Sequence, residues 1–185
     1  MRSLPTRLPG VIVLEPRIHG DSRGWFQETY RESVLADLGI TDRFVQDNHS
    51  RSARGVLRGM HFQVTEPQAK LVRCARGRIL DVVADIRRGS PTFGQWEAWE
   101  IDDERGLQVY CPVGFAHGFV VLSDVADVVY RCSAYYDPDG DSAIAYDDPD
   151  LGITWPDMAV SVSDRDRSAP RLAEVADQLL FAWSG

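Results

Sequence analysis

Val56-Leu57-Arg58-Gly59-Met60-His61-Phe62-Gln63 is the first of three closely spaced segments whose residues are typical of β-strands. The next two segments are residues 69–75 and 78–86, and the dipeptides Glu66-Pro67 and Arg76-Gly77 between them are typical of turns. These short connections leave no room for a crossover helix between one strand and the next. This part of the chain therefore excludes a parallel α/β sheet.

The same pattern of short strands and turns extends over most of the chain. Turns are predicted at Gly20-Asp21, at Gly89-Ser90-Pro91 and at Pro138-Asp139-Gly140. The ten predicted strands are residues 11–14, 25–30, 44–50, 56–63, 69–75, 78–86, 95–101, 107–112, 118–122 and 127–134. The fold class is thus all-β, and the spacing favours a two-sheet sandwich or a jelly-roll barrel with a few short peripheral helices.

Two helices are expected outside the sheets. Residues 31–39 contain helix formers and end on Gly39, a favourable residue just after a helix. Residues 172–183 are predicted to form the second helix, within a C-terminal segment, about 168–185, that packs on the barrel exterior. The 185 residues contain no repeat or long linker, so residues 1–185 are predicted to form one domain.

Composition indicates a soluble globular protein, with 44% hydrophobic and 26% charged residues. No stretch approaches the roughly 20 apolar residues of a membrane span, and Pro5, Pro9 and nearby charges interrupt any signal-peptide core. Three cysteines, Cys74, Cys111 and Cys132, lie in apolar segments and are predicted to be buried reduced thiols. We therefore expect a cytoplasmic location and no membrane partner.

The net charge of −8 argues against a nucleic-acid partner, but the charge is unevenly distributed. Residues 51–80 carry seven basic residues and one acidic residue, a charge of +6, so the remainder carries −14. This distribution favours a small anionic ligand over a long polyanion. The alternative is that individual arginines simply face water.

His61 is the leading catalytic candidate because it alternates with Gly59 and Gln63 on one face of its strand. If that face points into the barrel, the imidazole stands in a ligand cavity, where it can transfer protons near neutral pH. The alternative is a histidine satisfied within the core. Strict alternation places Arg58 on the opposite face, unless Gly59 marks a bulge that turns it inward.

Three further side chains are candidates for the same chemistry. Lys70 is the only lysine, and its ammonium can sit against a single oxygen atom; its strand is expected to pair with that of His61. Tyr130 lies centrally in an apolar strand, where its phenol either donates a proton or belongs to the core. Asp166, in a predicted polar loop, is a candidate to orient His61, and Asp164 competes for that role.

The segment Pro112-Val113-Gly114-Phe115-Ala116-His117 resembles the second sequence motif of the cupin superfamily, which implies a cupin-type jelly-roll barrel. Metal-binding cupins carry His-x-His and a later glutamate in the first motif. The corresponding stretch here, His61-Phe62-Gln63, holds one imidazole, so no metal is predicted. His117 is then a structural residue or a ligand contact.

Taken together, residues 10–170 resemble the dTDP-4-dehydrorhamnose 3,5-epimerase family of nucleotide-sugar epimerases. The similarity is carried by residues 20–24, 44–50, 56–63, 68–73, 87–96, 112–119, 130–132 and 148–149. It implies epimerisation, without a cofactor, of a dTDP-4-keto-6-deoxyhexose at C3 and C5, converting dTDP-4-dehydro-6-deoxyglucose to dTDP-4-dehydrorhamnose. It also implies a homodimer, as do the sheet edges that such a barrel leaves open.

The resemblance implies a role for each candidate residue. His61 is the general base and pairs with Asp166, Tyr130 is the acid, and Lys70 contacts the C4 oxygen of the sugar. Arg58 contacts the diphosphate. The implied nucleotide contacts, partly made across the dimer interface, are Arg23, Glu28, Gln46 and Asn48, and Gln63 and His117 complete the substrate-binding set.

Three alternatives remain open at the level of sequence. Relatives of this family invert only C3 or only C5, or isomerise a 3,4-keto pair, and the presence of His61 and Tyr130 does not choose among the carbons. A metal-dependent cupin dioxygenase or isomerase is disfavoured by the missing second histidine. A non-catalytic sugar-binding barrel would bind ligand without exchanging its protons.

Overall fold

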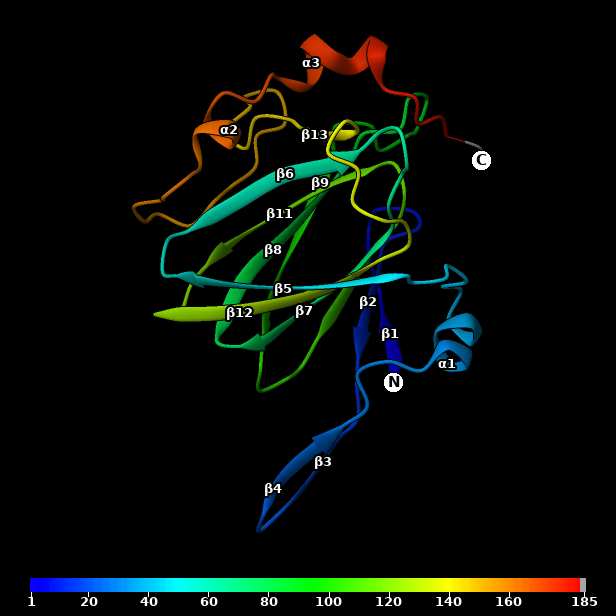
Figure 1. Ribbon diagram of the computed structural model, residues 1–185, viewed down its shortest axis with the longest axis vertical. Coiled ribbons are helices and arrows are strands. Elements are labelled where there is room, and N and C mark those ends of the chain that lie inside the picture. The colour runs from blue at the N-terminus through cyan, green and yellow to red at the C-terminus, as the bar shows by residue number, and fades with distance from the viewer. Residues whose placement is uncertain (184–185) are drawn as a thin grey trace.

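Two antiparallel sheets face each other in the computed structural model, which describes residues 1–183 (Figure 1). The first sheet has six strands in the order β1 (Arg2–Leu4), β2 (Ile12–Glu15), β10 (Gln108–Cys111), β7 (Lys70–Arg76), β12 (Val125–Cys132) and β5 (Gln46–Ala53). The second has five, in the order β13 (Asp141–Ala143), β6 (Leu57–Gln63), β11 (Phe115–Val121), β8 (Arg78–Asp85) and β9 (Trp96–Asp102). The all-β prediction is confirmed.

Strands that follow one another in the sequence mostly lie in opposite sheets, as in a jelly roll. The expectation that the strand of Lys70 pairs with that of His61 is therefore wrong. β7 pairs with β10 and β12, whereas β6 pairs with β11 and β13. Lys70 and His61 instead stand on opposite walls of the space between the sheets, and both line the same cavity.

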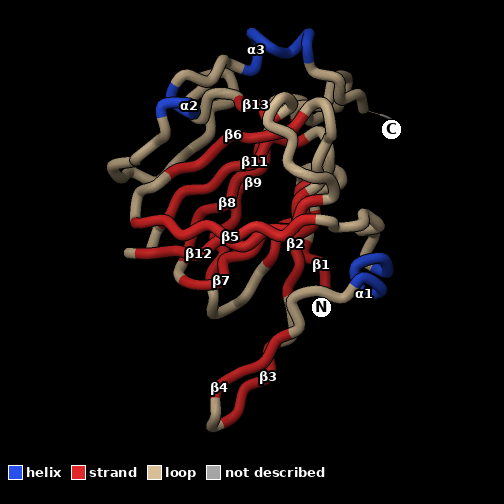
Figure 2. The backbone as a smooth tube through the Cα atoms, viewed as in Figure 1, coloured by secondary structure: helices blue, strands red, loops and turns tan. Residues whose placement is uncertain are grey.

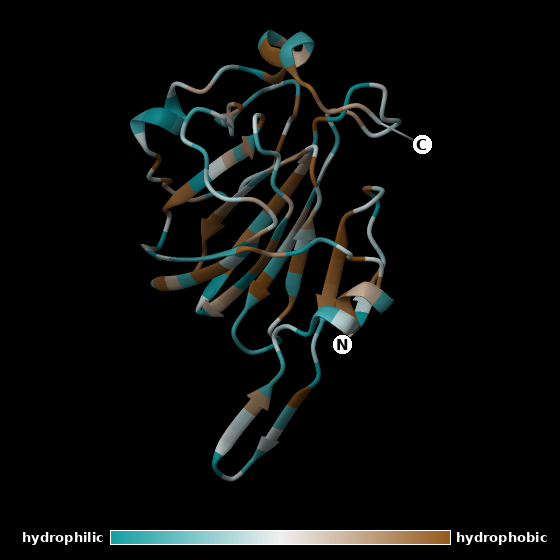
Figure 3. Ribbon diagram, turned by 45° about the vertical axis from the view of Figure 1, so that its right-hand side comes forward, coloured by the Kyte–Doolittle hydropathy of each residue, from teal (hydrophilic) through white to brown (hydrophobic). Residues whose placement is uncertain are grey.

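A hydrophobic core fills part of the space between the sheets. Its fully buried members include Val13, Val72 and Val109 from the first sheet, and Ile79 and Val83 from the second. The strands that supply them are largely hydrophobic, whereas the short helix α2 (Asp164–Arg167) is hydrophilic along its length (Figure 3). This core occupies only part of the space between the sheets, and the rest of that space is available for a ligand site.

A hairpin of β3 (Ile18–Asp21) and β4 (Gly24–Gln27) projects from one end of the molecule and pairs with neither sheet (Figures 1 and 2). The predicted turn at Gly20-Asp21 is misplaced, because these two residues close the β3–β4 ladder and the chain reverses at Ser22-Arg23. Residues Trp25 and Phe26 are 60% and 69% exposed. The hairpin therefore carries two large apolar residues that its own barrel does not bury.

Helical segments cover the outside of both sheets. The predicted first helix is confirmed as α1 (Glu32–Asp37), whose Leu35 packs with Leu14 and Leu71 on the outer face of the first sheet. The predicted helix over residues 172–183 is mostly wrong. Only α3 (Leu172–Val175) and a 3-10 turn (Ala176–Gln178) form, and the chain then runs extended, with Ala182 bridged to Arg88.

The extended end of the chain lies over the outer face of the second sheet. Leu172, Leu179 and Phe181 are buried there with Met60 and Phe62, which explains why this segment abandons the helix: its apolar residues follow the sheet surface. Residues 184 and 185 of the predicted C-terminal segment lie outside the described residues. No helix among residues 1–183 is long and apolar enough to cross a membrane.

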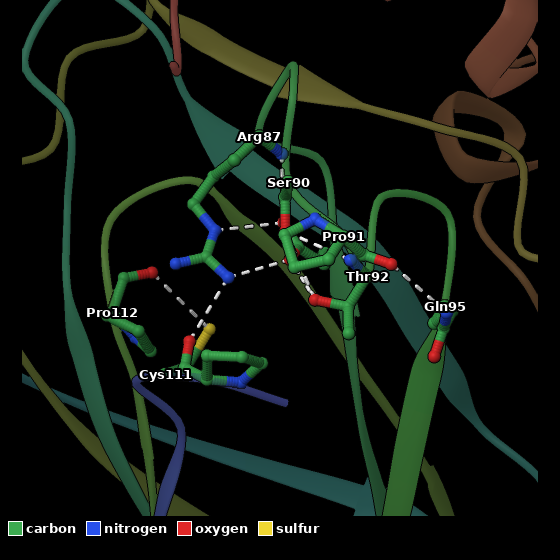
Figure 4. Close-up of polar contacts among 9 residues, drawn as sticks. Arg87, Ser90, Pro91, Thr92, Gln95, Cys111 and Pro112 are labelled. Atoms are coloured by element: carbon green, nitrogen blue, oxygen red, sulfur yellow. Dashed lines mark hydrogen bonds and ion pairs between the residues drawn. The ribbon is translucent and has the colours of Figure 1, made fainter. Parts of the chain in front are cut away.

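A buried ion pair between Arg87 and Asp85 connects the C-terminal segment to the second sheet (Figure 4). Arg87 forms a bidentate pair with Asp85, whose second oxygen also accepts hydrogen bonds from Ser90 and Thr92. The Arg87 guanidinium also lies over the rings of Phe115, at 4.2 Å, and of Trp183, at 4.4 Å. Arg87 thus connects Trp183, the last described residue, to the second sheet.

Candidate active site

A cavity of about 300 Å³ lies between the two sheets and is lined by residues from both. It brings together eight of the residues predicted from sequence: Gln46, Asn48, Arg58, His61, Gln63, Lys70, His117 and Tyr130. Gln46, Asn48, Lys70 and Tyr130 come from the first sheet, and the other four come from the second. The ligand space is therefore bounded by charged and polar side chains on both walls.

Arg58 reaches this cavity through a bulge in β6. His61 is opposite His117, while Arg58 is opposite Phe119, so three steps along β6 match two along β11. A Cβ atom on Gly59 would lie 2.6 Å from the Cα of Gly118, so the two strands approach too closely there for any other residue. The bulge alternative of the sequence analysis is confirmed, and Arg58 Nε donates to Ser52 Oγ at 3.1 Å.

His61 is held by Asp166, with 2.8 Å between Nε2 and Oδ1. Asp166 lies in helix α2, not in the predicted loop, because Ser163 caps the helix by accepting from the Asp166 backbone N–H. Asp166 is buried, whereas the competing Asp164 is exposed. Since a carboxylate only accepts, neutral His61 donates from Nε2 and carries its lone pair on Nδ1.

The Asp166 carboxylate is kept ionised by its surroundings. Burial by itself raises the pKa of Asp166, but the hydrogen bonds from His61 and from the Gly59 backbone N–H outweigh burial and lower that pKa overall. An ionised, fixed carboxylate fixes the tautomer of His61 and stabilises the imidazolium that forms when His61 takes a proton.

A second histidine–aspartate pair adjoins the first. His117 Nε2 lies 2.7 Å from Asp81 Oδ2, and the Asp81 side chain is completely buried in β8. The sequence analysis did not single out Asp81. Its signal is a lone carboxylate between Leu80 and Val82 in an apolar strand, since a charge in such a place needs a specific partner.

Lys70 and Tyr130 stand opposite the histidines, on the first sheet. Lys70 is aligned with Cys111 on one side and Cys132 on the other, so small thiol side chains flank its stem. No carboxylate pairs with Lys70 in residues 1–183, which leaves its ammonium for a ligand. Burial raises the pKa of Tyr130, so this phenol keeps its proton at neutral pH.

The cavity rim contains three residues that sequence reasoning missed. Tyr136 donates from its hydroxyl to Asp141 at 3.1 Å, and Arg165 pairs with the same carboxylate oxygen at 2.6 Å. All three line the cavity. They come from the β12–β13 loop, from β13 and from α2, and nothing in their sequence spacing links them.

Asp166 contacts His61 without lining the cavity, and two other predicted residues, Arg23 and Glu28, lie away from the site of their own chain. Arg23 pairs with Asp21 within the hairpin, and Glu28 pairs with Arg31 just after it. Neither lines the space that holds His61. The three cysteines are free and buried, as predicted. Within residues 1–183, no three or more His, Cys, Asp or Glu side chains gather in a group able to hold a metal ion.

Comparison with known proteins gives consistent matches over the whole barrel. A family model described as dTDP-4-dehydrorhamnose 3,5-epimerase matches residues 5–174. A protein of that name from Methanothermobacter thermautotrophicus is 48% identical, over 89% of this chain and 91% of the relative. A Legionella pneumophila dTDP-6-deoxy-D-glucose-3,5-epimerase, solved with dTDP-4-keto-L-rhamnose, superposes with a TM-score of 0.96 at 45% identity and covers 100% of this chain and 99% of its own. A 3'-monoepimerase from Streptomyces bikiniensis, solved with dTDP-quinovose, has a TM-score of 0.88 at 43% identity, over 94% and 89% of the two chains.

Proposed function

Because this chain belongs to the dTDP-4-dehydrorhamnose 3,5-epimerase family, we propose that it inverts C3 and C5 of a dTDP-4-keto-6-deoxyhexose. The chain is an isomerase of the epimerase type. One observation carries the assignment of roles: His61 and Tyr130 lie on opposite sheets and line the same cavity. Inversion of a carbon requires a base on one face of the sugar and an acid on the other.

The first half of the reaction is removal of a proton next to the C4 ketone. The ketone acidifies the hydrogens on C3 and C5 and receives the electron pair as an enolate, so the substrate itself supplies the electron sink and no cofactor is proposed. His61 takes the proton at Nδ1 while Asp166 balances the imidazolium. A positioned base of this kind contributes roughly 10²–10⁴-fold to the rate.

The enolate oxygen is stabilised by Lys70. Lys70 lines the cavity and no carboxylate pairs with it in residues 1–183, so its positive charge is available to the C4 oxygen. A fixed donor at a developing oxyanion is worth about 3–4 kcal/mol of barrier. His117, held in place by Asp81, lies beside His61 and is proposed to contact the sugar.

The second half is return of a proton to the opposite face. Tyr130 is protonated at neutral pH, since burial raises its pKa, and it faces the cavity from β12. Donation from its hydroxyl to the enolate carbon leaves that carbon inverted. Arg58 is proposed to hold the diphosphate, and Gln46 and Asn48 are proposed to contact the nucleotide.

Arg23 and Glu28 fit this scheme in a homodimer. They lie on and just after a hairpin that is remote from their own cavity and exposes Trp25 and Phe26. Strand β5, which carries Gln46 and Asn48, is an edge of the first sheet and offers unpaired backbone groups. We propose that the hairpin of one subunit lies against this edge of its partner and brings Arg23 and Glu28 to the partner's cavity. A cytoplasmic location, where thiols stay reduced, is proposed from the three free cysteines.

Deuterium incorporation tests the proposal. The purified protein is incubated with dTDP-4-keto-6-deoxyglucose in heavy water, and the sugar is analysed by mass spectrometry and proton NMR. We expect deuterium at both C3 and C5, and none with His61→Asn. Absence of label with folded wild-type protein would refute the assignment for this substrate.

The same measurement decides the alternative. The similarity to a 3'-monoepimerase at 43% identity favours single-carbon inversion as the second candidate. In that case deuterium enters at one carbon only, and the other carbon keeps its hydrogen however long the incubation lasts.

A further inference from the structure

The loop that joins β12 to β13, residues 133–140, forms one wall of the cavity through Tyr136. This loop gains little from burial, because residues Tyr135 and Tyr136 are 70% and 56% exposed. Exposed loops with few apolar contacts open at low free-energy cost. Other interactions must therefore hold Tyr136 at the cavity.

Gln63 uses its whole amide group to hold this loop. Its Nε2 donates to the backbone oxygen of Tyr135 at 3.0 Å and to that of Glu66, and its Oε1 accepts from the backbone N–H of Asp137 at 2.9 Å. Both amide hydrogens are occupied and the side chain is buried. The amide therefore has no donor left for a ligand, although Gln63 was predicted to bind substrate.

Two more glutamines hold the neighbouring residues of the loop. Gln46 Oε1 accepts from the backbone N–H of Tyr136 at 2.9 Å, and Gln68 Nε2 donates to the backbone oxygen of Ala134 at 2.9 Å. Residues 134–137 are thus each held by a glutamine amide. The three glutamines come from β5, from β6 and from the β6–β7 connection, so the loop is fixed against both sheets.

Gln63 also relates this wall to the catalytic base. It lies two residues after His61 on the same strand, and both line the cavity. We propose that Gln63 and Gln68 are positioning residues. They fix the backbone of residues 134–137 and thereby hold Tyr136 in place as one side of the binding site for the nucleotide sugar. The inference rests on the proposed function and assigns to these two glutamines a role in binding that acts through the backbone of residues 134–137.

Hydrogen exchange tests the clamp without reference to any substrate. In the wild type, the amides of Tyr136 and Asp137 are protected by glutamine oxygens. Loss of one intramolecular hydrogen bond changes an opening equilibrium by roughly fivefold, so Gln63→Met, which removes two from the loop, is expected to speed exchange in residues 133–137 by roughly 25-fold. Unchanged exchange in this segment would overturn the proposal.

Steady-state kinetics with dTDP-4-keto-6-deoxyglucose test the consequence for binding. Gln63→Met and Gln68→Met are expected to raise KM roughly tenfold and to change kcat less than about threefold, because the His61–Asp166 pair is untouched. Gln95→Met is the matched control: Gln95 also donates to a loop carbonyl, that of Pro91, but does not line the cavity (Figure 4). A parallel fall in kcat and in the melting temperature, at constant KM, would show a merely structural role and overturn the proposal.

Gln63→Glu separates hydrogen bonding from packing. Glutamate matches the shape of glutamine but places a carboxylate against the carbonyl oxygens of Glu66 and Tyr135. We therefore expect Gln63→Glu to have a higher KM than Gln63→Met; the reverse order would refute the clamp. If the wild type itself shows no turnover, the proposed function fails, while the exchange experiment still decides the clamp.

Discussion

His61 and His117 are directly opposite each other on neighbouring antiparallel strands, and each pairs with its own buried aspartate. The two imidazoles thus project from adjacent strands toward one cavity, with Nε2 occupied in both. They differ in access: the side chain of His61 is 28% exposed and that of His117 only 8%. This difference supports the proposal that His61 transfers the proton and that His117 makes a deeper contact with the ligand.

Asp166→Asn is expected to lower kcat by at least about 10²-fold, because the amide no longer balances the imidazolium of His61 and can favour the wrong tautomer. Asp164→Asn is the matched control, since Asp164 belongs to the same helix but is exposed. Steady-state rates of both variants check this prediction. Equal losses in the two variants would contradict it and indicate a general effect on helix α2.

Tyr130→Phe is expected to separate proton exchange from inversion. His61 can still remove a proton and return deuterium to the same face, while the acid on the opposite face is missing. In heavy water, the recovered sugar should therefore carry deuterium with its original configuration. NMR of the recovered sugar distinguishes this result from a complete loss of label, which would assign the first proton transfer to Tyr130 instead.

Lys70→Met is expected to reduce kcat by about 10²–10³-fold through loss of charge at the enolate oxygen. Lys70→Arg should restore little of this activity, because Cys111 and Cys132 flank the position closely and a guanidinium is wider than an ammonium. Kinetics of the two variants, with thermal unfolding as a check on folding, provide the test. Near-normal activity of Lys70→Arg would show that charge alone suffices.

Complementation between subunits tests the homodimer. If Arg23 completes the partner's cavity, a heterodimer of one His61→Asn and one Arg23→Ala subunit has one cavity with both defects and one with neither. Mixed heterodimers are therefore expected to regain about half of the wild-type activity per dimer, although each homodimer is impaired. No recovery in isolated heterodimers would place Arg23 outside the partner's site.

Arg87→Met is expected to destabilise the fold by about 3–5 kcal/mol, since it leaves Asp85 buried without its cation. Burial raises the pKa of Asp85, but hydrogen bonds from Arg87, Ser90 and Thr92 outweigh burial and lower it overall. Because the pKa of Asp85 is lower in the folded state than in the unfolded state, its ionised form stabilises the fold. This contribution is complete above the unfolded-state pKa near 3.9 and is lost as the pH falls through the folded-state pKa. Urea unfolding should show a difference between wild type and variant that is full at neutral pH and shrinks below about pH 4. A difference independent of pH would contradict the role of Asp85.

Local patterns in the sequence predict most of the strands, and the bulge at Gly59 could be foreseen as an alternative. The order of strands within each sheet could not be foreseen, because alternating apolar residues and turn residues do not show which segments cross from one sheet to the other. Lys70 illustrates this limit: its own segment was identified, and the neighbour expected for it was wrong. The helix expected over residues 172–183 failed for a related reason, since contact with Met60 and Phe62 overrides local helix propensity.

Some site residues can likewise be found from the sequence, and others cannot. His61, Tyr130 and Lys70 stand out by residue type within strands, so sequence reasoning finds them. The partners that orient the two histidines are harder to find: Asp166 follows His61 by 105 residues, and Asp81 precedes His117 by 36. The rim formed by Tyr136, Asp141 and Arg165 exists only once three distant segments meet.

The long separation in sequence between His61 and Asp166 has a consequence for folding of the protein during its synthesis. A nascent chain emerges from its N-terminus, and barrels dominated by contacts between distant residues fold slowly. His61 is translated 105 residues before Asp166, and the segment that carries Asp166 docks through the backbone pairing of Ser161 with Gly55 and Leu57. The His61–Asp166 pair can therefore form only after Asp166 has been synthesised and its segment has docked, so a test of turnover by newly synthesised protein would also report this late folding step.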